Sequence, residues 1–195
     1  MKLLLVALMG VSLASSRVEA SQSKVAIQKS NAQVLNATAS WMTDKIENGG
    51  YDIQTPFHRF VRSYSDVTFQ NGVAKLVIRS QTFTGKELLV DETSEITFAL
   101  KRLDRVVVNS HNIGAGEYED VVLYTRGDEA VQIKTTVAVD KMREVDENGN
   151  EVKKAPRAKV ETKTDNAVSI SFTDPVDAQA VASAFNFAIL MAKDS

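Results

Sequence analysis

The residue types that could carry chemistry are few. His58 and His111 are the only imidazole bases in this 195-residue chain, and it has no cysteine. Nucleophilic catalysis requires a base held beside the nucleophile. Neither histidine belongs to a recognisable catalytic motif, and no Gly-x-Ser-x-Gly elbow is present. We therefore expect both histidines to be ordinary surface residues, with no catalytic residues and no enzymatic activity.

Metal sites are weakly indicated. A zinc ion usually takes three or four Cys, His or carboxylate ligands, so the two histidines would need carboxylates such as Glu117, Glu119 and Asp120. The segment from Asp146 to Glu151 has oxygen-bearing side chains, but it lacks the glycine placement and the final glutamate of a calcium loop. The sequence predicts no metal site and no cofactor.

One group of basic and aromatic residues stands out, namely Arg62, Tyr64, Lys75 and Arg79. Asn-Gly at 71–72 is a strong signal for a two-residue hairpin turn. Counting outward from that turn pairs Tyr64 with Arg79 and places the group on the outward face. A cation–π contact across the strands is then expected. This candidate contact patch either stabilises the hairpin or docks an anionic or protein partner.

The first twenty residues resemble a secretory signal peptide. Lys2 supplies a positive charge, Leu3 to Leu13 form an apolar run, and Val18-Glu19-Ala20 ends it with small residues. The run is shorter than the roughly 20 residues needed to span a bilayer. We predict cleavage after residue 20, export to a periplasm or the exterior, and no transmembrane segment afterwards. The net charge of −2 provides no basic footprint for nucleic acid.

The remaining chain, 21–195, is predicted to be a single globular domain. The pattern favours an N-terminal helical segment (21–50, with a helix from Asn31 to Asn48 and Trp41 as a core anchor) and an antiparallel β region (57–173). Within the β region, a second hairpin is expected at Gly127-Asp128, and a protruding hairpin at 140–156. A C-terminal helix (174–193) is capped by Asp174. Its broad apolar stripe predicts a helix that covers a sheet or closes a barrel.

The fold class expected is mainly β (α+β), a bent antiparallel sheet or small barrel of about seven to eight strands. This element order, with the closing stretch from Phe172 through Met191, resembles the PH-like superfold. That resemblance implies a bent barrel plugged by the final helix. Lipid-binding members carry basic residues around the first hairpin loop, whereas here the loop Gln70–Val73 is neutral. A helix-grip fold, whose curved sheet wraps the last helix around an apolar cavity, is the alternative.

We expect from these features an exported, non-enzymatic interaction or binding module of the cell envelope or exterior. The alternative is a carrier of a small apolar ligand or lipid, held in a cavity under the C-terminal helix. The partner would be an unidentified protein or a small apolar ligand, and not nucleic acid.

Overall fold

The computed structural model describes residues 37–114, 116–127, 130–140, 144–145, 151–152 and 159–193. Ala39–Ser195 form one compact unit and Met1–Thr38 another. The predicted leader, the predicted helix start at Asn31 and the tip of the hairpin predicted at 140–156 lie outside the described residues. No helix in the described part of the chain is long and apolar enough to cross a membrane.

The described part is mainly β, as predicted. A helix occupies residues 37–47 and ends before Gly49 and Gly50. After it come β1 (Tyr51–Gln54), β2 (Arg59–Gln70), β3 (Val73–Thr84), β4 (Glu87–Ala99), the short helix η1 (Leu100–Arg102), β5 (Leu103–Asn112), β6 (Glu117–Thr125), β7 (Val131–Asp140), β8 (Glu144–Val145), β9 (Glu151–Val152), β10 (Lys159–Asp165), β11 (Ala167–Phe172) and α2 (Pro175–Lys193).

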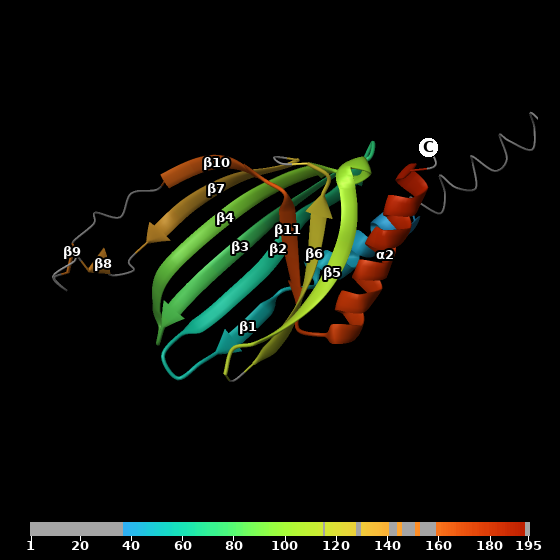
Figure 1. Ribbon diagram of the computed structural model, residues 1–195. Coiled ribbons are helices and arrows are strands. Elements are labelled where there is room, and N and C mark those ends of the chain that lie inside the picture. The colour runs from blue at the N-terminus through green and yellow to red at the C-terminus, as the bar shows by residue number, and fades with distance from the viewer. Residues whose placement is uncertain are drawn as a thin grey trace, which may run out of the picture. The chain divides into compact units, whose positions relative to one another are not determined.

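Nine of these strands form two antiparallel sheets. The large sheet has the order β1-β2-β3-β4-β7-β10, and the small sheet has the order β11-β6-β5. Consecutive strands β4 and β5 lie in different sheets, as do β6 and β7 and also β10 and β11, so the chain passes between the two sheets at three places. Figure 1 shows the large sheet curving away from the small sheet, with α2 beside the latter. The sheets are not closed into a barrel, so of the two predicted forms the bent sheet is correct.

The first predicted hairpin exists, but its register changes partway along. Asn71 and Gly72 have φ values of 52° and 72°, as a two-residue turn of this kind requires, and Phe69 pairs with Ala74 as predicted. A β-bulge then intervenes at Asp66, whose φ is 52°. Tyr64 consequently pairs with Ile78 and not with Arg79. Because of this one extra residue, the side chains of β2 that precede the bulge in the sequence lie on the face opposite to the predicted one.

The bulge is stabilised by the preceding helix. A bulged residue loses its ladder partners, and here the Val67 amide donates to Glu47 Oε1 at 3.0 Å. The Thr43 hydroxyl donates to the Val67 carbonyl at 3.4 Å. Helix 37–47 thus satisfies the backbone groups that the sheet leaves unpaired.

The second predicted hairpin, at Gly127-Asp128, is wrong. β6 pairs with β5 and β11, while β7 pairs with β4 and β10. The Arg126 amide donates to the Arg102 carbonyl, and the Thr125 amide to the Asn166 carbonyl. These bonds tie the segment to the neighbouring corners, so the chain bends there and does not reverse. The small hairpin β8–β9 pairs Glu144 with Val152.

The core lies between α2 and both sheets. Asp174 caps α2 as predicted, accepting the Val176 amide at 2.8 Å. Buried side chains of the two sheets, including the fully buried Phe98, meet the inner stripe of α2 at Val181 and Phe185. Side chains of α2 and of both sheets therefore meet in the space beneath the helix. Trp41, predicted to be a core anchor, is 38% exposed; Met42 and Ile46 fill the core from that helix instead.

Candidate functional site: a polar hollow between the sheets

The concave face of the large sheet changes character along its strands. Near α2 it is apolar and filled, with Leu76, Ile96 and Ile133 side by side across three strands. Beyond them the same face becomes polar, and Ser94 and Thr135 share a hydrogen bond of 2.9 Å. The next row across all six strands contains Tyr51, Arg62, Ser80, Glu92, Val137 and Lys159. Polar and charged side chains therefore continue the concave face where the core stops.

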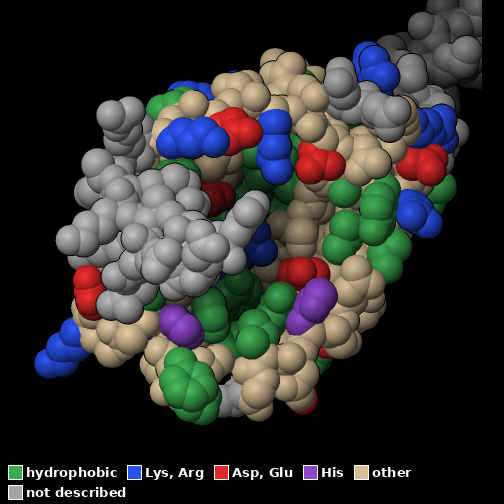
Figure 2. Space-filling view, turned by 60° about the vertical axis from the view of Figure 1, so that its left-hand side comes forward, with side chains coloured by type: hydrophobic (Ala, Val, Ile, Leu, Met, Phe, Trp, Pro, Cys, Tyr) green, Lys and Arg blue, Asp and Glu red, His purple; other side chains and the backbone are tan. Residues whose placement is uncertain are grey.

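The small sheet turns one face toward this polar row. Its buried apolar face, with Val121 and Ile170, belongs to the core. Because side chains alternate along a strand, Asp120 and Ser171 lie together on the opposite face. Figure 2 looks into the hollow between the two sheets, where acidic, basic and hydrophobic side chains are visible and histidine side chains lie at the margin.

A chain of polar contacts joins the two sheets at the base of the hollow. The Ser171 amide donates to the Tyr64 hydroxyl at 2.6 Å, and Arg62 Nη1 donates to Ser171 Oγ at 3.1 Å. Ser171 Oγ in turn donates to Asp120 Oδ1 at 2.5 Å. His111 Nε2 lies 3.2 Å from Asp120 Oδ2. Five side chains from four strands, β2, β5, β6 and β11, thus form one network.

Two glycines lie next to this network, where the small sheet contacts β1 and β2. Gly50 donates its amide to the Ser171 carbonyl at 2.8 Å, and its φ is +101°. A Cβ there would lie 2.1 Å from the Arg62 carbonyl oxygen. Gly116 has the same role at the β5–β6 turn, where a Cβ would lie 2.9 Å from a methyl carbon of Ile53. These two glycines let the edges of the small sheet approach β1 and β2 closely.

Two polar atoms in this region are buried without a partner. Arg62 Nε and Ser169 Oγ are shielded from solvent and have no hydrogen-bond acceptor or donor in the described part of the chain. The bond to Ser171 is the one hydrogen bond that the Arg62 side chain makes among the described residues, and no carboxylate there forms an ion pair with it. A guanidinium has five N–H donors. Most of the donors of the Arg62 guanidinium therefore have no partner in the part of the protein that the structure describes.

Aromatic rings border the network. The Tyr51 and Tyr118 ring centroids are 4.6 Å apart, and the His111 ring stacks on Tyr118 at 4.9 Å. Burial raises the pKa of the Tyr51 and Tyr118 phenols, and it also raises the pKa of Tyr64, which is nearly fully enclosed. All three phenols are therefore neutral at physiological pH, and the charges here belong to arginine and to carboxylates.

The predicted contact patch is divided between two faces. Arg62 and Tyr64 point into the hollow, because the bulge reversed their direction. Lys75 and Arg79 are on the outer face of β3, where Arg79 forms a bidentate pair with Asp91 at 2.9 and 2.7 Å. The outward four-residue patch is therefore wrong as a unit, although it contained the arginine that the hollow uses.

The two histidines lie in different settings. His58 is part of a turn in which its amide donates to Thr55 Oγ1 at 3.0 Å. His111 contacts Asp120, one of the carboxylates that the sequence had suggested as a possible companion. Asp120 lies between Ser171 and His111, whereas a catalytic triad places the histidine beside the serine hydroxyl. No cluster of three or more potential metal ligands occurs in the described ranges.

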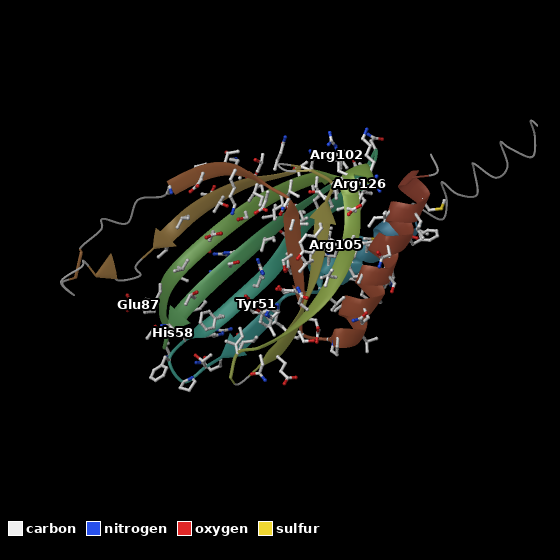
Figure 3. All side chains as sticks on the ribbon, viewed as in Figure 1. Tyr51, His58, Glu87, Arg102, Arg105 and Arg126 are labelled. Atoms are coloured by element: carbon white, nitrogen blue, oxygen red, sulfur yellow. The ribbon has the colours of Figure 1, made fainter. Side chains whose placement is uncertain are left out.

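A second group of charged residues, three arginines, lies away from Tyr51 and His58 (Figure 3). Tyr51 and His58 lie toward one end of the large sheet, while Arg102, Arg105 and Arg126 lie at the opposite corner. Arg105 is exposed and its guanidinium stacks over the Tyr124 ring at 4.3 Å.

Sequence reasoning missed Ser171, Ser169 and Glu92. The alternation of Ser169 and Ser171 with Val168, Ile170 and Phe172 was a usable signal, because it places both hydroxyls on one face of a strand whose other face is core. Nothing in the sequence indicated that this face would meet Arg62, which is 109 residues away along the chain.

No family model matches this chain, and neither does any curated protein or solved structure. The resemblance to the PH-like superfold therefore stays a prediction. What the structure defines is a class: a bent, open antiparallel sheet with a polar hollow beside its core.

Proposed function

We propose that this protein is a non-enzymatic binding module that holds a small ligand in the hollow and uses Arg62 to bind an anionic group of that ligand. The observation that carries the proposal is the state of Arg62. Its guanidinium is half-buried, uses one hydrogen bond to Ser171, and has no ion-pair partner in the described part of the chain.

The physical reason is the cost of enclosing a charge that has no direct ion-pair partner. Removing a charged group from water is unfavourable unless it is paired and hydrogen-bonded. Guanidinium groups bind carboxylates and phosphates through two parallel hydrogen bonds, which are stronger than bonds between neutral groups. A ligand with such a group would supply the missing partner, and the contact would be protected from full solvent screening.

The order of the groups around Ser171 supports binding over catalysis. Ser171 is fully buried, and its hydroxyl oxygen accepts from Arg62 while it donates to Asp120, so the oxygen is enclosed by its partners and not open to a substrate. The network fixes the orientation of Arg62, since Ser171 Oγ accepts from Nη1 and Ser171 is itself held by Asp120 and Tyr64.

The test compares Arg62→Gln with Lys75→Gln, which removes an exposed charge from the outer face of the neighbouring strand. The probes are benzoate, citrate, inorganic phosphate and dodecanoate, followed by thermal shift and calorimetry. A ligand at 100 times its Kd stabilises by about 2.7 kcal/mol, which raises the Tm of a domain of this size by about 5–10 °C. We expect such a shift in the wild type and in Lys75→Gln, and its loss in Arg62→Gln.

Two results would overturn this proposal. If no anionic probe shifts the Tm, or if the shift survives Arg62→Gln in a variant that remains folded by circular dichroism, Arg62 is not the anchor. Binding of dodecanoate alone, independent of Arg62, would support the alternative function, the carrier of an apolar ligand.

We further propose that the module works outside the cytoplasm, on the strength of the predicted leader at 1–20. Mass spectrometry of the protein from a fractionated secreting host should then show a mature chain that begins at Ser21. A chain that retains Met1 and stays in the cytosolic fraction would refute export.

A further inference from the structure

A second charge without an ion-pair partner among the described residues lies on the concave face, two strands from Arg62. Glu92 lies in the same row of the concave face as Arg62, with Ser80 between them. Its orientation is fixed by Ser94, whose hydroxyl donates to Glu92 Oε1 at 3.4 Å. That hydroxyl is the one polar partner of Glu92 in the described ranges, and no cation is paired with it.

Arg62 and Glu92 do not neutralise each other. Neighbouring strands are about 4.8 Å apart, so two residues separated by one strand have Cα atoms about 10 Å apart. No ion pair joins them, although both side chains are long and are half-buried on the same concave surface. The hollow therefore presents a separated positive and negative charge, neither of which forms an ion pair with a residue that the structure describes.

The other charged groups that face this row already have partners. Asp120 accepts from Ser171 and contacts His111. Lys159, at the edge strand β10, is paired with Glu161 at 2.8 Å. Arg62 and Glu92 are thus the pair of opposite charges in the row that a ligand would complement.

We propose that the ligand is amphoteric, of the amino-acid or short-peptide class, with its carboxylate on Arg62 and its ammonium group on Glu92. This inference rests on the proposed function. A carboxylate matches the planar guanidinium, an ammonium group matches a carboxylate acceptor, and the Ser80 hydroxyl between them can bond to either end.

The spacing of the two ligand charges separates the members of this class. In a free α-amino acid the ammonium nitrogen is about 2.5 Å from the carboxyl carbon, and each further residue adds up to about 3.5 Å. A free amino acid would therefore bridge the row only if the Arg62 and Glu92 side chains converge over Ser80. A dipeptide or tripeptide would span it with both side chains extended across the hollow.

The experiment uses the mature full chain and measures affinity by calorimetry. The twenty amino acids, glycyl dipeptides and triglycine are screened by thermal shift, and the strongest binder is compared with its N-acetyl and C-terminal amide derivatives. The variants are Arg62→Gln, Glu92→Gln and the control Glu95→Gln. Glu95 lies on the same strand but on the outer face, where it pairs with Lys134 at 3.2 Å.

We expect Glu92→Gln to weaken binding of the parent compound by about tenfold or more, since breaking one partner of a half-buried charge pair is costly. Binding of the N-acetyl derivative, which lacks the ammonium group, should be weak and should be unaffected by Glu92→Gln. Glu95→Gln should bind like the wild type.

The experiment distinguishes failure of the amphoteric ligand from failure of the anion-binding function. If carboxylates bind in an Arg62-dependent manner, and acetylation and Glu92→Gln change nothing, the amphoteric ligand is refuted while the anion-binding function stands. If no compound binds in an Arg62-dependent manner, both are refuted.

Discussion

Tyr64→Phe tests whether the contact between the two sheets is as the structure shows. The substitution removes one oxygen atom and preserves the ring, which is 5% exposed. The Ser171 amide, which donates to that oxygen at 2.6 Å, loses its acceptor in a buried position. Leaving a buried donor unsatisfied costs about 1–3 kcal/mol. For a domain of this size each kcal/mol lowers the Tm by about 2–4 °C.

The assay is urea and thermal denaturation of the wild type, Tyr64→Phe and the control Tyr51→Phe. The Tyr51 hydroxyl is half-buried and has no hydrogen-bond partner in the described part of the chain, so its removal should change stability by less than about 0.5 kcal/mol. Tyr64→Phe should lower the free energy of unfolding by about 1–2 kcal/mol and increase hydrogen exchange at the Ser171 amide. Equal stability of the two variants would show that the Tyr64–Ser171 bond does not hold the sheets together.

The same residue predicts an effect in alkali. Burial raises the pKa of Tyr64 above its ordinary value of 10.0. Above that pH the unfolded phenol loses its proton while the native phenol keeps it, so the native state binds more protons and stability falls as pH rises. Denaturation midpoints measured across this range should fall less steeply in Tyr64→Phe. An identical pH dependence in the wild type and the variant would contradict the assignment.

Three further predictions concern stability. Gly50→Ala should severely destabilise or unfold the protein, because the new Cβ would lie 2.1 Å from a carbonyl oxygen. In Gly72→Ala the new Cβ would have no atom within 4 Å, so this variant should lose only about 1–2 kcal/mol through backbone strain. Urea titration of both variants measures the difference. Phe185→Ala should cost about 3–5 kcal/mol by calorimetry, and Leu190→Ala, at 61% exposure, should be nearly neutral. The hydrogen bond from Arg79 lowers the pKa of Asp91 below 3.8, so Asp91→Asn should destabilise the protein at neutral pH. The difference in unfolding free energy between the wild type and this variant should shrink as acid protonates the native carboxyl. A difference that stays constant with pH would contradict this.

Local chemistry made several elements predictable. The Asn71-Gly72 turn, the alternation in β11 and the Asp174 cap with its helix were all readable, because each depends on neighbours within a few residues. The bulge at Asp66 was not readable, since it is stabilised by Glu47 across the tertiary structure.

The amino-acid sequence by itself determined the mainly β class, the final helix and the absence of disulfide staples. The tertiary structure alone decided which charges meet. Arg62 faces the hollow because one bulged residue reversed the direction of its side chain. Ser171 reaches Arg62 because the chain passes from the large sheet to the small sheet between β10 and β11. Alternation fixes which residues of a strand share a face, but only packing against distant elements decides where each face points.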